Sequence, residues 1–176
     1  MKRINTWMLA EAGITLAMAW VLNQIKLFPM PYGGSVTAGG MVPLLLFAFR
    51  WGGLRGMAVC SLYGVLDLVL GGHFYHWFSI IFDYPVAFGM IGLAGFFGKK
   101  TGALAAGTLV GLTGRFLFHV LSGVVAFAEY APEGQTPLLY SVLYNGAYML
   151  PELVISFLLV FLVLRYARLP EPKLAV

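Results

Sequence analysis

The chain is a succession of long apolar segments separated by short breaks of glycine, proline and charged residues. Six such segments cover about residues 7–25, 38–50, 54–71, 76–97, 102–126 and 138–164. Of all residues, 60% are hydrophobic and only 10% are charged, which is more apolar surface than a soluble domain of 176 residues can bury. Because about 20 apolar helical residues span a bilayer core, we predict an all-α membrane protein, one domain over residues 1–176 with six transmembrane helices.

The basic residues predict how these helices are oriented. With six spans, nine of the eleven Lys and Arg residues fall on one side of the membrane, and loops rich in Lys and Arg are cytoplasmic. The nine are Lys2, Arg3, Arg50, Arg55, Lys99, Lys100, Arg165, Arg168 and Lys173. Both termini are therefore predicted to be cytoplasmic. The same rule favours two spans at 38–50 and 54–71, because a single long one would place Lys99 and Lys100 outside.

A long loop rich in proline and glycine, residues 26–40, joins the first two predicted spans. Pro29, Pro31 and the pairs Gly33-Gly34 and Gly39-Gly40 end any helix there. Long loops often act as lids or binding loops. We therefore expect this loop to cover a site on the outer side, with a passive connector as the alternative.

A carboxylate marks the candidate site. Asp83 lies about two helical turns, roughly 10 Å, below the outer end of the fourth predicted span. A charge at that depth is costly, so it indicates a functional residue by default. The other polar, aromatic and small residues predicted near that depth are Tyr84, His119, Gly123, Phe127, Tyr140, Tyr144 and Asn145.

Together these residues suit a flat ligand that carries a positive charge. Ring faces attract a cation, a carboxylate neutralises it, and an asparagine both donates and accepts at a heteroaromatic edge. His119, Gly123 and Phe127 share one helix face at four-residue spacing, and the glycine leaves room between the larger side chains. Two alternatives stay open: the tyrosines are interfacial belt residues, or Asp83 simply pairs with Arg115 or His119.

Three further charges, Asp67, Arg115 and Glu152, fall inside predicted spans. Because an unpaired charge is costly there, we expect Arg115 to pair with Glu152 or Asp67. We also expect no spare basic residue at the outer depth to meet a phosphate group. His73 and His76 are three residues apart but lack further metal ligands nearby, so we expect them at the membrane interface.

The first predicted span carries small residues at four-residue spacing, Gly13 with Ala17 and Thr15 with Ala19. Such rows let another helix approach closely. Packing within the chain and docking of a separate membrane protein both fit this pattern.

Enzymatic chemistry has little support in the sequence. Gly98-Lys99-Lys100-Thr101 lacks the upstream glycine of a phosphate-binding loop, and no Gly-x-Ser-x-Gly or His-Glu-x-x-His motif is present. We therefore expect a chain that is not an enzyme, binds no cofactor or metal and does not itself hydrolyse ATP.

Six motifs follow one another along nearly the whole chain: Pro31-Tyr-Gly-Gly-Ser-Val-Thr, Leu46-Phe-Ala-Phe-Arg50, Asp83-Tyr-Pro-Val-Ala-Phe, His119-x-x-Ser-Gly123, Ala128-Glu-Tyr-Ala-Pro and Tyr144-Asn-Gly-Ala-Tyr-Met-Leu-Pro-Glu152. Taken together they resemble the ThiT or YuaJ family of thiamine transporters. Proteins of that family are the substrate-binding S components of energy-coupling factor (ECF) transporters. The resemblance implies a multi-pass protein of a bacterial cell membrane.

The resemblance also implies high-affinity binding of thiamine from outside, beneath a lid formed by the first loop. It matches Asp83 to an acidic residue that faces the thiamine cation. The other residues that it matches are Tyr84, His119, Gly123, Tyr140 and Asn145. Phe127 stands where a stacking tryptophan is frequent in the family, and Phe28 or Tyr32 is expected to serve as the aromatic residue of the lid.

The partners that the resemblance implies are an ECF transmembrane coupling protein and two cytoplasmic ATPases, with the small-residue rows of the first span as the contact for the coupling protein. Two alternatives remain: an S component for another vitamin, and a membrane assembly protein without a small ligand.

Overall fold

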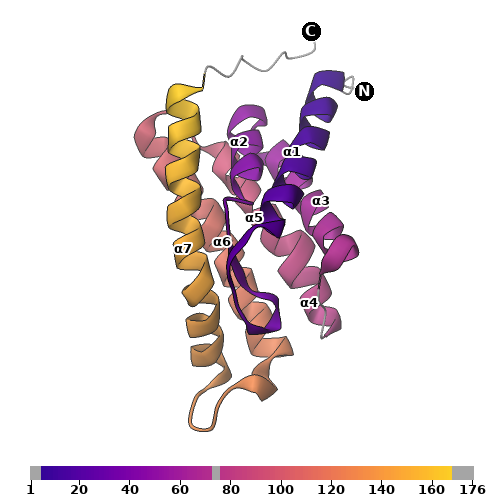
Figure 1. The fold of residues 1–176 in the computed structure, drawn as a ribbon, viewed down its shortest axis with the longest axis vertical. Helices are drawn as coiled ribbons and strands as arrows, with labels where there is room; N and C mark the ends of the chain where they lie inside the picture. The colour runs from indigo at the N-terminus through magenta and orange to yellow at the C-terminus, as the bar shows by residue number, and fades with distance from the viewer. Residues whose placement is uncertain (1–4, 73–75, 168–176) are drawn as a thin grey trace.

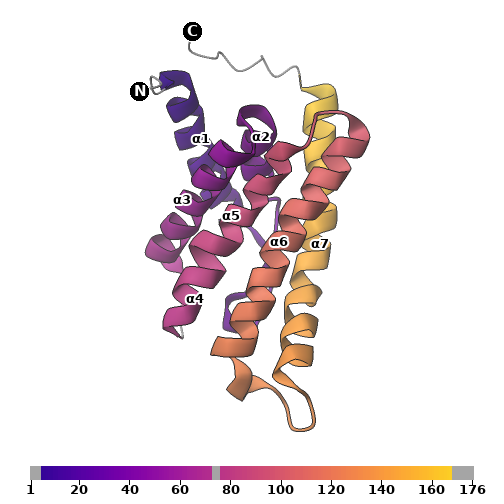
Figure 2. The same cartoon turned by 180° about the vertical axis from the view of Figure 1, so that it is seen from behind.

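The computed structural model describes residues 5–72 and 76–167, which form a bundle of helices (Figures 1 and 2). Its long helices are α1 (Thr6–Gln24), α3 (Gly53–Gly71), α6 (Thr101–Ala126) and α7 (Pro137–Tyr166), with the shorter α2 (Val42–Trp51) between the first two. The start of α1 and the end of α7 lie at the same end of the bundle (Figure 1).

Among the described residues, four helical stretches are long and apolar enough to cross a membrane: Gly53–Gly71, Trp77–Phe96, Thr101–Ala126 and Pro137–Tyr166. They match the third to sixth predicted spans, and the prediction of a helical membrane protein is confirmed. The first two predicted spans correspond to α1 and the short apolar α2. The count of six spans and the side that faces the cytoplasm stay predictions. Four of the basic residues behind the predicted orientation, Lys2, Arg3, Arg168 and Lys173, lie outside the described residues.

The fourth predicted span changes its helical pitch along its length. It comprises α4 (Trp77–Ile81), a π-helical turn η2 (Phe82–Val86), α5 (Ala87–Ile91) and a 3-10 segment η3 (Gly92–Phe96). Pro85 has no N–H to donate and crowds the preceding turn, so the helix widens there, and the N–H of Ala87 reaches the carbonyl of Phe82. Asp83 lies in this widened turn.

The start of this span is capped by His76, whose Nδ1 accepts a hydrogen bond from the backbone N–H of Phe78 at 3.1 Å. The predicted interfacial position of His73 falls outside the described residues.

The first loop is more ordered than predicted, because it folds into a β-hairpin. Strand β1 (Lys26–Pro29) pairs antiparallel with β2 (Ser35–Thr37), so the chain is mostly helical but not purely so. The turn between them, η1 (Pro31–Gly33), has left-handed φ angles of 61° at Tyr32 and 97° at Gly33. The side chain of Val36 packs in a small cluster with Tyr148 and Met149 of α7, which anchors the hairpin to the bundle.

Close backbone packing holds the bundle core together. Lipid is as apolar as the protein interior, so helices in a membrane associate through close contact of small residues. At Gly92, an added Cβ would lie 2.1 Å from the backbone nitrogen of Met57, which means that α3 and η3 touch through their backbones. Leu44, Leu45 and Tyr63 are fully buried in the main hydrophobic core.

The two small-residue rows of α1 have different environments. Thr15 and Ala19 are buried against the rest of the chain, and the carbonyl of Ala19 accepts a hydrogen bond from the Tyr63 hydroxyl at 3.4 Å. Their assignment to a docking surface is therefore wrong: they pack within the chain. Gly13 and Ala17 are exposed. Only their row remains available to a partner helix.

Candidate ligand-binding site

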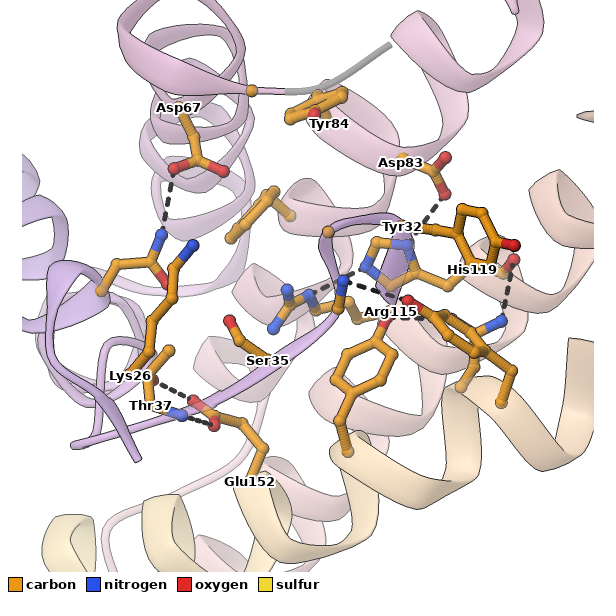
Figure 3. A pocket seen from close by; sticks show the side chains of 18 of the residues that line it. Lys26, Tyr32, Ser35, Thr37, Asp67, Asp83, Tyr84, Arg115, His119 and Glu152 are labelled. Carbon is orange, nitrogen blue, oxygen red and sulfur yellow. Dashed lines mark hydrogen bonds and ion pairs between the residues drawn. The ribbon is translucent and has the colours of Figure 1, made fainter. Parts of the chain in front are cut away.

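A cavity of about 200 Å³ lies between α1, α3, η2, α6, α7 and the hairpin. It is found toward the end of the bundle opposite the start of α1, because the helix ends at Gln24, Gly71 and Phe127 line it. Its walls include every residue of the predicted binding site: Tyr32, Asp83, Tyr84, His119, Gly123, Phe127, Tyr140, Tyr144 and Asn145. Figure 3 shows several of these side chains converging on the same space. That they bind a ligand stays a prediction, but the structure brings them together.

The carboxylate of Asp83 is held by two donors on α6. One oxygen lies 2.9 Å from Nδ1 of His119, and the other accepts a hydrogen bond from the Ser122 hydroxyl at 2.7 Å. The expected alternative, a pair with His119, is therefore present. It coexists with the binding role, because Asp83 and His119 both line the cavity. Ser122 was not predicted as a site residue from the sequence, although it lies on α6 one turn from His119.

Arg115 determines which nitrogen of His119 carries the proton. Its Nε donates a hydrogen bond to Nε2 of His119 at 3.2 Å. Since a guanidinium can only donate, Nε2 must be the acceptor and Nδ1–H must donate to Asp83. The chain Arg115–His119–Asp83, visible as dashed lines in Figure 3, thus keeps His119 neutral and leaves the negative charge on Asp83.

The predicted partner of Arg115 is wrong. Instead of an ion pair with Glu152 or Asp67, its guanidinium lies 4.4 Å from the ring centroid of Phe88 and contacts the sulfur of Met41. A ring face and a neutral imidazole therefore accommodate this buried cation.

The start of α7 contributes a stripe of aromatic rings and a fixed amide. Tyr140, Tyr144 and Tyr148 follow one another with ring centroids 6.1 and 5.9 Å apart. Asn145 is buried beside them: its carbonyl oxygen accepts from the Tyr148 hydroxyl at 2.8 Å, and its amide donates to the carbonyl of Ser141 at 2.9 Å. These bonds fix the orientation of the Asn145 side chain at the cavity wall.

Gly123 lets α6 and α7 approach closely at this level. An added Cβ would lie 2.1 Å from the Ser141 Oγ and 3.6 Å from the Asn145 amide nitrogen. The space predicted at this glycine is therefore taken by α7. The contact sets the distance between His119 on one helix and Asn145 on the other.

The tip of the hairpin covers the cavity through Tyr32. Its ring centroid lies 4.8 Å from that of Tyr130 and 6.5 Å from that of Tyr144. The Tyr144 hydroxyl accepts a hydrogen bond from the N–H of Gly34 at 3.1 Å and donates to the carbonyl of Pro31. Of the two aromatic residues considered for the lid, Tyr32 lines the cavity, whereas the side chain of Phe28 is 61% exposed and does not.

The base of the hairpin is attached to α7 by Glu152. Its two carboxylate oxygens accept hydrogen bonds from the backbone N–H and the hydroxyl of Thr37, both at 2.7 Å. The hydroxyl oxygen of Thr37 accepts in turn from the N–H of Gly40 at 3.0 Å. Glu152 is only 2% exposed, so this buried charge serves as a fixed anchor for the strand.

The structure also places at the cavity several polar residues that the sequence analysis did not assign to a site. Asn23, Lys26 and Asp67 line it, together with Arg115 and Glu152. The expectation that no basic residue could meet a phosphate group is therefore wrong, because Lys26 and Arg115 both reach the cavity. Among its described lining residues, three carboxylates against two cations leave a formal charge of −1.

Comparisons with known proteins point to one family. The model of the thiamine transporter protein family (Thia_YuaJ) matches residues 9–170. The chain is 34% identical over 163 residues to the thiamine transporter ThiT of Bacillus subtilis, covering 84% of each protein. It is 29% identical over 178 aligned residues to ThiT of Lacticaseibacillus paracasei, covering 89% of this chain and 86% of that protein.

A solved structure of ThiT from Listeria monocytogenes has the same fold. The two superpose with a TM-score of 0.82 at 25% sequence identity, over 91% of this chain and 94% of the other.

Proposed function

The chain belongs to the thiamine transporter family, and we propose that it binds thiamine in the described cavity from the outer side of the membrane, as the high-affinity substrate-binding subunit of an ECF transporter. One observation carries the proposal: a carboxylate, a row of tyrosine rings and a fixed amide line a single cavity of net charge −1. The protein then acts in a bacterial plasma membrane as a multi-pass subunit and has no catalytic role of its own.

The chemistry of thiamine fits these walls. It has two flat heteroaromatic rings, one of which carries a permanent positive charge. The rings of Tyr140 and Tyr144 offer faces that attract a cation, and the Asp83 carboxylate neutralises it. The aminopyrimidine ring is both a donor and an acceptor, which matches the Asn145 amide and the tyrosine hydroxyls.

The hairpin provides a route for capture. Its tip is attached by Tyr144, on the same helix as Tyr140 and Asn145, and its base by Glu152. We propose that the tip detaches to admit thiamine and closes over it, while the base stays anchored to α7.

Transport requires an energy source outside this chain. We propose the partners of the family, a transmembrane coupling protein and two cytoplasmic ATPases, and assign the contact with the coupling protein to the exposed row of Gly13 and Ala17 on α1.

The ligand is tested on purified protein in detergent with a panel of vitamins. A ligand that binds the native state raises the melting temperature by mass action, so thiamine is expected to raise it strongly, whereas riboflavin and biotin leave it unchanged. Native mass spectrometry identifies any ligand that copurifies. A shift with another vitamin alone would indicate an S component of different specificity, and no shift with any vitamin would favour an assembly protein.

The energising partners are tested by uptake of labelled thiamine in cells that express the chain with and without an ECF module. Ala17→Leu is expected to abolish uptake while thiamine binding by the purified variant persists. Ala147→Leu, an exposed alanine on α7, is the matched control and should leave both unchanged. Uptake that proceeds equally well without the module would contradict the proposed partnership.

A further inference from the structure

The cavity has a second polar end that the binding of flat rings does not use. It is formed where the end of α1, the start of the hairpin and the end of α3 meet. Its walls are Asn23, Lys26, Asp67, Gly71, Gly72 and Tyr84. Gly71 borders open space there, whereas Gly72 is in close contact with Tyr84: an added Cβ would lie 2.7 Å from its hydroxyl.

Asp67 offers this end an acceptor that no other described residue occupies. One carboxylate oxygen accepts a hydrogen bond from the Asn23 amide at 3.1 Å. The other makes no hydrogen bond with any described residue, and Figure 3 shows it turned into the cavity on the side of Tyr84. A partly buried carboxylate oxygen gains most from a donor, since hydrogen bonds to charged groups are the stronger kind.

Lys26 gives the same end a cation. It is exposed at the start of β1, where its backbone pairs with β2, and its ammonium makes no hydrogen bond with another described residue. Lys26 and Asp67 line the same cavity, and the Asp67 carboxylate interacts electrostatically with Arg115 and, less strongly, with Lys26. Asp67 therefore repels a negatively charged group of a ligand, whereas Lys26 attracts it.

We propose that this second end recognises the alcohol tail of the ligand, with the free oxygen of Asp67 accepting the hydrogen of its terminal hydroxyl. The inference rests on the proposed function: with the rings of thiamine between Asp83 and the tyrosine stripe, its hydroxyethyl tail extends toward Asp67. A phosphate ester in the same place has lost that hydroxyl hydrogen and brings negative charge against the carboxylate. Asp67 thus selects the free alcohol over the phosphorylated vitamin, and Lys26 moderates the selection.

The test compares dissociation constants for three probes by isothermal titration calorimetry on purified protein. The probes are thiamine, thiamine monophosphate and the thiamine analogue whose tail hydroxyl is replaced by chlorine. The wild type is expected to bind thiamine about tenfold or more tightly than the chloro analogue, the size of one hydrogen bond to a charged group. Asp67→Asn is expected to shift the preference between thiamine and its monophosphate at least about tenfold toward the phosphate.

Two further variants keep the test independent of folding defects at Asp67. Lys26→Gln changes an exposed side chain and is expected to shift the preference the opposite way, toward the free alcohol. Glu129→Gln removes an equal charge from an exposed residue that does not line the cavity, and should change neither ratio.

The outcomes separate the two proposals. A wild type that binds none of the three probes overturns the proposed function itself. A wild type that binds thiamine, with ratios that stay unchanged in both Asp67→Asn and Lys26→Gln, leaves that function standing and overturns the role of the second end. Equal binding of thiamine and the chloro analogue by the wild type also overturns it.

Discussion

Replacing Asp83 by asparagine removes the negative charge of the cavity next to the bound cation while nearly preserving the shape of the side chain. For a carboxylate and a ligand cation about 5 Å apart in an effective dielectric of about 20, the Coulomb attraction is about 3 kcal/mol. A loss of that size weakens binding roughly a hundredfold. Asparagine can keep both hydrogen bonds, because its oxygen accepts from His119 and its amide donates to the Ser122 hydroxyl, so the substitution removes mainly the charge.

The assay is calorimetric titration of purified Asp83→Asn with thiamine at fixed ionic strength, with circular dichroism and gel filtration to verify the fold. Ser122→Ala is the matched control: it removes one donor to the same carboxylate but leaves the charge, so a loss of only about fivefold is expected. If Asp83→Asn folds normally and binds thiamine within threefold of the wild type, the carboxylate does not face the cation and the charge argument fails.

Three other changes probe the supports of the site. Tyr144→Phe removes the hydroxyl that attaches the hairpin tip, and thiamine dissociation measured by stopped flow should become about tenfold faster; an unchanged rate would mean that this bond does not hold the lid. Gly123→Ala forces a Cβ against Ser141 and should lower both melting temperature and affinity, with recovery in the double variant that also carries Ser141→Gly; a stable, tightly binding single variant would exclude the close contact. Glu152→Gln weakens the two hydrogen bonds from Thr37, so the free energy that protects the amides of residues 35–40 from hydrogen exchange should fall by about 1–3 kcal/mol. Exchange at the wild-type rate would show that this anchor is not needed.

The predicted core of the site agrees with the structure because its signals are local. A carboxylate two turns inside an apolar helix is conspicuous in any membrane sequence. Four-residue spacing then places His119 and Gly123 on one face, and the stripe from Tyr140 to Tyr148 on another, without knowledge of tertiary contacts. Pro85 signals a disturbed helix, although the π-helical turn that presents Asp83 could not be specified from the sequence.

The second polar end could not be found in this way. Asn23, Lys26 and Asp67 come from a helix end, a strand and another helix, and each is a single polar residue without a periodic pattern. Only the packing of α3 beside the end of α1 and the start of the hairpin places them together. The hairpin itself is short, and its β1 residues are all exposed, so the alternation that identifies a half-buried strand is missing.

Arg115 shows a different limit. From the sequence, we predicted a carboxylate partner for Arg115, and Glu152 and Asp67 were the acidic residues considered. In the structure, Glu152 is committed to Thr37 and Asp67 to Asn23, while Arg115 is accommodated by Phe88 and a neutral imidazole. An inventory of charges alone does not count ring faces or histidine tautomers as partners for a buried cation.

A structure determined with thiamine bound locates the ligand relative to these side chains. The rings are expected between the tyrosine stripe and His119, with the positively charged ring facing the Asp83 carboxylate and Tyr32 closed over them. Density for thiamine outside this cavity, or inside it with the charged ring turned away from Asp83, would contradict the proposed recognition of the cation.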